Sequence, residues 1–164
     1  MHIQKLSDAD LEAIYSIINE AAEAYKGKIP PDCYHEPYMS QMELQNEISA
    51  GVQFYGITHE GKLAAVMGIQ PVGDVTLIRH AYTLPKYQSH GLGSQLLRYL
   101  LSLAKTRCIL VGTWQVASWA IRFYQKHGFI LLSREETNRL LGKYWNIPKR
   151  QIETSTVLEQ WHNP

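Results

Sequence analysis

The chain has 164 residues, of which 45% are hydrophobic and 19% are charged, and its formal net charge at pH 7 is +1. These proportions are typical of a folded globular domain and argue against intrinsic disorder. The near-neutral charge gives no electrostatic basis for nucleic-acid binding, and no apolar run approaches the roughly 20 residues that a membrane span requires. We therefore expect one domain over residues 1–164 that binds neither nucleic acid nor membrane.

The cysteines and the N-terminal residues indicate the cellular compartment of the protein. Cys33 and Cys108 form no C-x-x-C motif, and the first residues show no apolar stretch followed by a small-residue cleavage site. The sequence thus predicts a cytoplasmic protein without a structural disulfide. The histidines are dispersed along the chain, so no metal site is predicted.

Helical periodicity and turn residues predict a strand and two helices in the first part of the chain. A capping-box pattern at Ser7 and Asp10 precedes apolar residues at helical spacing, which predicts a helix to about Tyr25. The segment that follows contains three prolines and is predicted to be irregular. Ser40 then predicts the start of a helix over residues 41–50.

The later elements are mostly strands. Short turns join three extended runs, which predicts an antiparallel meander over residues 52–60, 62–72 and 74–84. The remaining elements are a helix over 92–104, a buried strand over 108–114, a helix capped by Ser118 and ended by Gly128, a strand over 129–133, an irregular or helical segment over 134–148, and a strand over 152–159.

This order of elements predicts an α/β (α+β) fold. A central mixed and mostly antiparallel sheet of about seven strands, flanked by about four helices, buries the apolar faces. The last strand offers an edge along which two copies of the chain could pair as a homodimer.

The stretch QSHGLGS, residues 88–94, joins an extended run to a leucine-rich helix. A strand that turns into a helix directs unpaired backbone N–H groups at one point, and the helix dipole favours an anion there. Gly91 and Gly93 remove side chains that would block a phosphate. The alternative is a tight turn that binds no ligand.

Two familiar phosphate loops do not fit this stretch. A nucleotide P-loop requires Lys and Ser or Thr after its second glycine, whereas Ser94 and Gln95 follow Gly93. A dinucleotide-binding loop requires a third small residue at the position of Leu96 and an acidic residue about twenty positions later. Neither requirement is met.

A third pattern fits. Thr83-Leu84-Pro85 followed by Gln88-x-x-Gly91-x-Gly93 resembles the acetyl-coenzyme A loop of the GNAT superfamily of N-acetyltransferases. Further along, the run from Ala120 to Phe129, AIRFYQKHGF, is similar to that family's second signature, A-x-x-F-Y-x-x-x-G-F. The resemblance covers the whole order of elements, and it implies a GNAT-like fold with two splayed parallel strands around the donor.

The resemblance implies the donor site. It indicates that acetyl-CoA lies between the two splayed strands, with its pantetheine arm along one strand end and its pyrophosphate on the backbone of the glycine loop. The residues implied in donor binding are Ala81, Tyr82, Thr83, Gln88, Ser89, His90, Gly91, Leu92, Gly93, Ser94 and Lys126.

The resemblance also implies a general acid. Tyr124 matches the family's usual acid, which protonates the departing thiolate, and a phenol with a pKa near 10 is protonated at neutral pH. The alternative is a core tyrosine packed beside Phe123.

The general base is less clearly indicated. Where relatives often carry a carboxylate on the strand before the loop, this chain has Leu77, and where they often carry a cofactor-binding asparagine it has Ala117. His80 has a suitable pKa, but in a regular strand it faces away from Arg79, and only a bulge would change that. Arg79 stays charged, so it would clamp an acceptor carboxylate or pair with an acid.

The resemblance also implies that the segment between the first two helices walls the acceptor pocket. An aromatic wall with few polar groups suits a small amine with an apolar or aromatic body, and His35 or Glu36 could serve as the base through a water. The alternative is that these side chains only fasten the proline-rich loop. The residues expected at the acceptor are Tyr25, Tyr34, His35, Glu36, Arg79 and Trp114. Tyr38 belongs to the same wall, and the stretch from Leu141 to Trp145 is expected to close the other side together with Trp114.

The leading interpretation is an acetyl-CoA-dependent N-acetyltransferase in which the primary amine of a small molecule attacks the bound donor directly. A non-catalytic acetyl-CoA sensor or regulatory module is the first alternative, favoured by Leu77 and Ala117 and opposed by Tyr124. A protein N-acetyltransferase is the second, and it would require an open groove.

Overall fold

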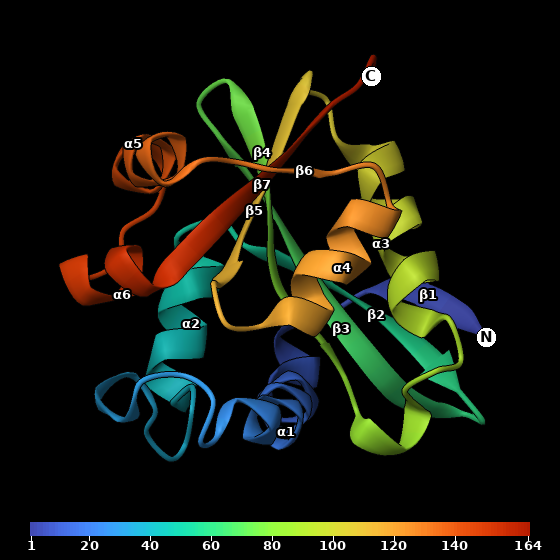
Figure 1. Ribbon diagram of the computed structural model, residues 1–164. Helices are drawn as coiled ribbons and strands as arrows, with labels where there is room; N and C mark the ends of the chain where they lie inside the picture. Colours follow the sequence, from blue (N-terminus) through green and yellow to red (C-terminus); the bar gives the residue numbers. More distant parts are fainter.

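The computed structural model describes residues 1–164 and contains a single seven-stranded sheet with the strand order β1-β2-β3-β4-β5-β7-β6 (Figure 1). All neighbouring strands are antiparallel except β4 and β5, which are parallel. The strands are β1 (His2–Lys5), β2 (Gln53–His59), β3 (Lys62–Val72), β4 (Val75–Thr83), β5 (Cys108–Trp114), β6 (Ile130–Leu131) and β7 (Ser155–Trp161).

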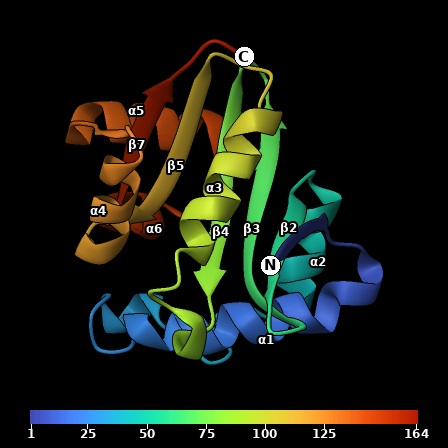
Figure 2. The same ribbon diagram turned by 90° about the vertical axis from the view of Figure 1, so that its right-hand side faces the viewer.

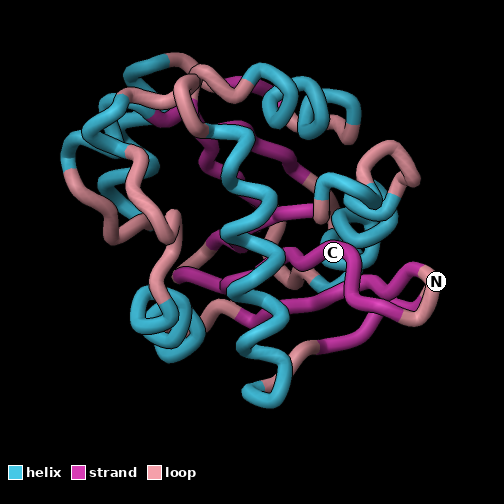
Figure 3. The backbone as a smooth tube through the Cα atoms, turned by 90° about the horizontal axis from the view of Figure 1, so that it is seen from below, coloured by secondary structure: helices cyan, strands magenta, loops and turns pink.

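Helices cover both faces of the sheet, as the view from below shows (Figure 3). One face packs on α3 and α4, and the other packs on α1 and α2 over one half and on α5 and α6 over the other. The helices are α1 (Leu11–Ala21), α2 (Gln41–Ser49), α3 (Leu92–Leu103), α4 (Ser118–Lys126), α5 (Arg134–Tyr144) and α6 (Lys149–Thr154). None of them combines the length and apolar character needed to cross a bilayer.

The mixed α/β sheet expected from the sequence is confirmed, and so are its parallel pair and several helix ends. The Ser7 backbone N–H donates to Asp10 Oδ2 at 2.8 Å, as the capping-box pattern predicts. Ser40 Oγ accepts from the Glu43 N–H at 3.1 Å at the start of α2. The first helix continues as a 3-10 turn to Tyr25, so its predicted end is also correct.

Four local expectations were wrong. Residues 152–154, expected in the last strand, belong to α6, and the expected strand over 129–133 shrinks to the exposed pair of β6. The cap of α4 is Ala117 rather than Ser118, and its side chain makes no capping bond. The last strand is not an edge, because β6 pairs with it.

The segment over 134–148, left open as irregular or helical, is largely the helix α5. Ser133 caps it by accepting from the Glu136 N–H at 3.2 Å. Together with α6 it adds two helices to the four that were expected. Leu140 and Leu141 of α5 are buried against the sheet, so tertiary packing stabilises a helix whose sequence shows only weak periodicity.

Candidate active site

The two parallel strands separate halfway along their length. Pairing between β4 and β5 extends only from Val75 opposite Cys108 to Ile78 opposite Val111. Figure 2 shows the strands diverging beyond this point, towards their carboxyl ends. Residues 79–82 of β4 and 112–114 of β5 line a cavity of about 120 Å³ between them. The unpaired ends of these strands therefore form the two sides of a pocket in the middle of the sheet.

A β-bulge in β4 lies where the strands part. Gly68 of β3 pairs with Arg79, but Val66, two residues earlier, pairs with Tyr82, so β4 contains one additional residue. His80 takes up this residue with a φ of +54°. Because the bulge interrupts the alternation of side chains, Arg79 and His80 point to the same face of the sheet. The sequence predicts that His80 lies near Arg79 only if a bulge interrupts the strand, and this bulge is present.

Both side chains contact one carboxylate, that of Glu47 on α2. Arg79 Nη1 lies 2.6 Å from Glu47 Oε2, and His80 Nε2 lies 3.1 Å from the same oxygen. Arg79 Nη1 also donates to Gln70 Oε1 at 3.3 Å. The side chains of Arg79 and His80 are only 14% and 15% exposed, so the cluster is largely shielded from solvent.

Burial and charge compete in this cluster. Burial alone would raise the pKa of Glu47, but the hydrogen bond with His80 and the charge of Arg79 hold that pKa below its ordinary value. Burial lowers the pKa of His80, with Glu47 acting in the opposite direction. At neutral pH the cluster therefore contains a glutamate anion, an arginine cation and a neutral histidine.

Tyr124 enters the cavity from the opposite face of the sheet. It lies on α4, its side chain is 5% exposed, and it lines the cavity. The rings of Phe123 and Phe129 pack against it, with centroids 5.1 and 5.6 Å away. Burial, assisted by the neighbouring Tyr25, raises the pKa of its phenol above the ordinary value. Tyr124 is therefore protonated throughout the neutral range and can donate a proton.

Aromatic side chains form one wall of the cavity. Tyr25 packs against Tyr38, Tyr82 and Trp114, with ring centroids 5.3, 6.4 and 6.5 Å away. Trp114 Nε1 donates to Tyr38 Oη at 2.7 Å, and burial raises the pKa of Tyr38. Hydrogen bonding thus fixes the loop that carries Tyr38 to β5, and the wall combines aromatic rings with the hydroxyl groups of Tyr25, Tyr38 and Tyr82.

The second wall comes from the chain between β6 and β7. Leu141, Trp145, Ile147 and Gln151 all line the cavity. A Cβ added to Gly112 would lie 3.4 Å from Trp145 Cζ2, so the indole lies directly against β5 at this residue. The segment that α5 and α6 occupy therefore closes the cavity on the face that also carries Arg79.

The glycine loop lies beyond the end of β4 and opens α3. Gly91 is the N-cap of α3, with a φ of +73°, and a Cβ added there would meet no heavy atom within 4 Å. A Cβ on Gly93 would lie 3.5 Å from Phe123, an ordinary contact distance, so α3 and α4 lie close together at this residue. The first N–H groups of α3 have no partner within the helix and face open space at Gly91. This arrangement fits a phosphate group.

The side chains around the loop are arranged as follows. His90 Nδ1 contacts the carbonyls of Gln88 and Tyr87 at 2.9 and 3.1 Å, which leaves its other ring nitrogen free of them. Ser94 Oγ lies 2.9 Å from His127 Nε2 of the second motif, linking the two motifs directly. Of the remaining expected donor-site residues, Thr83 ends β4, Ser89 lies exposed in the loop, and Lys126 is exposed at the end of α4.

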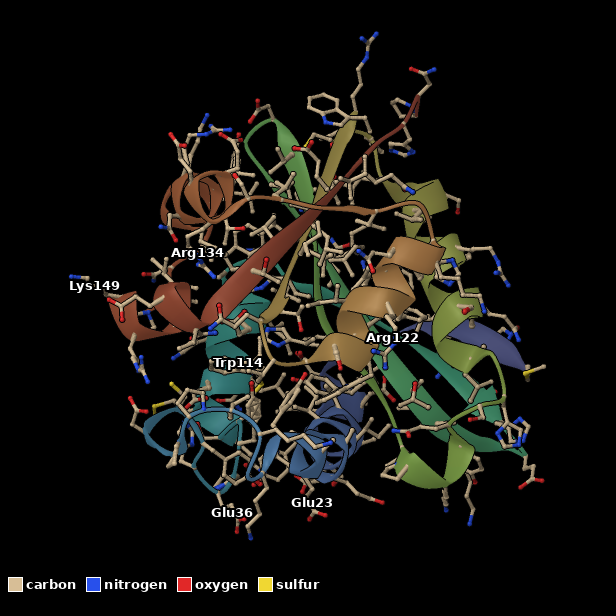
Figure 4. All side chains as sticks on the ribbon, viewed as in Figure 1. Glu23, Glu36, Trp114, Arg122, Arg134 and Lys149 are labelled. Atoms are coloured by element: carbon tan, nitrogen blue, oxygen red, sulfur yellow. The ribbon has the colours of Figure 1, made fainter.

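The structure brings together only part of the expected acceptor site. Tyr25, Arg79 and Trp114 line the cavity with Ala81, Tyr82 and Tyr124. The other expected residues lie in the exposed loop outside the lining, and Figure 4 shows Trp114 in the interior while Glu36 reaches outward at the lower edge. In that loop Tyr34 stacks on Tyr38, His35 Nδ1 contacts the Pro37 carbonyl at 2.8 Å, and Glu36 pairs with Lys26 at 3.1 Å.

Sequence reasoning missed Glu47, which contacts both Arg79 and His80. Glu47 had a detectable signal, because it is three residues after the fully buried Leu44 and so shares the inward face of α2. A carboxylate on the apolar face of a helix requires a partner. Tyr38 and Trp145, both expected at the walls of the acceptor pocket, line the cavity.

The fold and the site together define an acyltransferase-type architecture: parallel strands that separate around a pocket, a phosphate-fitting loop at one strand end, and a buried tyrosine from α4. Residues 11–129 match the family model described as the acetyltransferase (GNAT) family. No group of three or more potential metal-ligating side chains is present.

Solved structures of the same fold come from several organisms. The PaiA N-acetyltransferase of Thermoplasma acidophilum, in complex with coenzyme A, is 20% identical with a TM-score of 0.74, and 98% of each chain is covered. The ribosomal-protein-S18-alanine N-acetyltransferase of Escherichia coli is 19% identical with a TM-score of 0.71, with 99% of this chain and 94% of that chain covered. A GNAT-family acetyltransferase of Staphylococcus aureus is 16% identical with a TM-score of 0.72, with 98% of each chain covered.

The chain belongs to the GNAT family of acetyltransferases. It is an acetyltransferase with acetyl-CoA as its donor, as the two sequence motifs indicate.

Proposed function

We propose that this chain transfers the acetyl group of acetyl-CoA to the primary amine of a small molecule, by direct attack while both substrates are bound. The observation that carries the proposal is the position of Tyr124, buried in the cavity where β4 and β5 separate. The cavity has lining residues from both faces of the sheet, which suits a donor on the α3 and α4 side and an acceptor on the other.

The donor would be held mainly by backbone groups. The strand end from Ala81 to Thr83 offers unpaired N–H and C=O groups to the pantetheine arm, because β5 has already diverged from it. The loop from Gln88 to Ser94 would hold the pyrophosphate on the first N–H groups of α3. The PaiA structure is a complex with coenzyme A, which supports a coenzyme A thioester as the donor. Acetyl-CoA supplies an activated acyl group as a thioester.

Tyr124 would act as the general acid. Its phenol is buried and protonated, and it makes no hydrogen bond to another protein group that would have to be broken first. It can therefore give its proton to the thiolate that leaves when the amine takes the acetyl group. His80 would accept a proton from the acceptor amine on the opposite face, since burial keeps its imidazole neutral and Glu47 orients the ring.

The acceptor pocket favours a small molecule. The loop that carries Tyr38 and the segment that carries Trp145 cover the cavity from two sides. Tyr25, Trp114 and Trp145 would contact an apolar or aromatic body. A protein acceptor would need a more open groove.

The test is a panel of primary amines and short peptides with free N-termini, assayed with acetyl-CoA by mass spectrometry of the acceptor. We expect acetylation of small amines with apolar or aromatic bodies. Acetylation of the peptides alone would assign a protein acceptor. Binding of coenzyme A without transfer to any acceptor would indicate a sensor or regulatory module instead.

A further inference from the structure

The cavity contains one permanently charged side chain. Among its lining residues only Arg79 is charged at neutral pH, and the lining includes no lysine, aspartate or glutamate. The other lining residues are aromatic, aliphatic or neutral polar groups. Any selection of acceptors by charge must therefore act through Arg79.

Arg79 is already neutralised. Glu47 Oε2 lies 2.6 Å from its Nη1, and Gln70 Oε1 accepts from the same nitrogen at 3.3 Å. The Glu47 side chain is 27% exposed, so this ion pair is shielded from solvent far more than a surface pair. Glu47 is also held by His80, which fixes the carboxylate from a second direction.

A carboxylate on the acceptor that bound Arg79 would lie close to the carboxylate of Glu47. Nε and Nη2 of Arg79 are not used in the bonds to Glu47 and Gln70, so geometry alone would still allow a carboxylate to approach the guanidinium. That approach would place two carboxylates on one guanidinium in a poorly hydrated pocket, where like charges repel strongly. An amine without a carboxylate encounters no such repulsion.

We infer that Glu47 is a specificity-determining residue, which by neutralising Arg79 excludes amines that carry a carboxylate and leaves the pocket to carboxylate-free primary amines. The inference rests on the proposed N-acetyltransferase function. Glu47 acts through Arg79 and need not touch the acceptor itself.

Matched acceptor pairs test the inference with the wild-type enzyme. The pairs are 2-phenylethylamine and phenylalanine, tyramine and tyrosine, and 3-methylbutylamine and leucine, where the members of each pair differ by one carboxylate. We expect kcat/KM to favour the carboxylate-free member by at least about tenfold, as unfavourable like-charge placement requires. Equal or better acetylation of the amino acids would overturn the inference without any variant.

A charge-removing variant tests the role of Glu47 directly. Glu47→Gln keeps an oxygen that can accept a hydrogen bond from His80, but it leaves the charge of Arg79 without a counter-charge. The ratio of kcat/KM for the carboxylate-free acceptor to kcat/KM for its amino-acid partner should therefore fall at least about tenfold. Glu43→Gln makes the same chemical change on an exposed position of α2 and should leave the preference unchanged. A folded Glu47→Gln enzyme with the wild-type preference would contradict the inference.

A binding measurement separates this inference from the proposed function. Calorimetry with 3-phenylpropionate, in the presence of coenzyme A, should detect binding to Glu47→Gln but not to the wild type or to the double variant Glu47→Gln/Arg79→Gln. If no acceptor is acetylated, the proposed function fails while this comparison still decides the role of Glu47. Equal binding of 3-phenylpropionate to wild type and Glu47→Gln would overturn the inference.

Discussion

Arg79 on β4 and Glu47 on α2 form a shielded ion pair, with Arg79 Nη1 2.6 Å from Glu47 Oε2. The residues are 32 positions apart in the printed sequence, and the pair forms because α2 packs on the face of the sheet to which Arg79 points. The same carboxylate oxygen holds His80. The bulge therefore adds His80 to the ion pair on one side of the cavity.

Replacing Tyr124 by phenylalanine should lower kcat at least about tenfold, because the variant lacks the proton that the leaving thiolate requires. The buried ring remains, so the midpoint of thermal unfolding should change little. The matched control is Tyr99→Phe, an exposed tyrosine on α3. Wild-type kcat in Tyr124→Phe with a true acceptor would refute the role of this residue as the acid.

Two glycines should respond to alanine with opposite signs. Gly91 has a φ of +73°, so Gly91→Ala should destabilise the fold by about 1 kcal/mol, the cost of placing a side chain in the left-handed region. Gly142 lies within α5, where an added Cβ meets nothing, so Gly142→Ala should stabilise by about 0.5–1 kcal/mol. Denaturant unfolding measures both.

Coenzyme A affinity distinguishes the two glycine variants further. Calorimetric titration should show weaker binding to Gly91→Ala, because the loop backbone must shift, and unchanged binding to Gly142→Ala. Unchanged affinity in Gly91→Ala would argue against a pyrophosphate at this loop.

His80 should make the fold less stable in mild acid. Burial lowers its pKa in the folded state below the ordinary 6.5, so below pH 6.5 the unfolded chain binds a proton more readily than the folded chain does. Stability is thus fully present above about pH 6.5 and is lost as the pH falls towards the folded-state pKa. The lowered pKa of Glu47 adds a further loss below its ordinary value of 4.5.

The measurement is the free energy of unfolding between pH 7.5 and pH 5. His80→Asn should flatten this dependence, since asparagine tolerates the positive φ and does not titrate. His35→Asn, an exposed position in the proline-rich loop, should keep the wild-type slope. An unchanged slope in His80→Asn would contradict the assignment.

The two cysteines should differ in reactivity. Burial, reinforced by Glu159, raises the pKa of the Cys108 thiol to about 11, so almost no thiolate is present at pH 8. Cys33 is only half-buried. Iodoacetamide at pH 8 should therefore add one label to the native protein and a second only in denaturant, as read by intact mass. Cys33→Ser should remain unlabelled when native; rapid labelling of that variant would contradict the prediction.

Much of the fold could be predicted because its signals are local. The capping pattern at Ser7, the cap at Ser40 and the apolar spacing of α3 act within a few residues, and the structure confirms each of them. The two motifs, around Gly91 and around Phe123, likewise lie in continuous stretches. A backbone-dominated donor site can be identified from such stretches because the loop geometry depends on its own glycines.

The acceptor side could not be predicted in the same way. Helix α6 replaces the first part of an expected strand, because packing of Ile152 and its neighbours outweighs their β-propensity. Glu36 and His35, near aromatic residues in the sequence, lie outside the cavity, whereas Glu47 lies beside it. These positions depend on contacts between segments that are far apart along the chain.

The sequence by itself determined the class of donor and the order of the elements, since both follow from short motifs and from periodicity. Only the tertiary structure decided which of the expected residues line the cavity and which others join them. The bulge turns His80 to the face of Arg79, α2 brings Glu47 to both, and the segment after α5 places Trp145 on Gly112. Each of these is a long-range contact, and its energy comes from burial and charge pairing that no local pattern encodes.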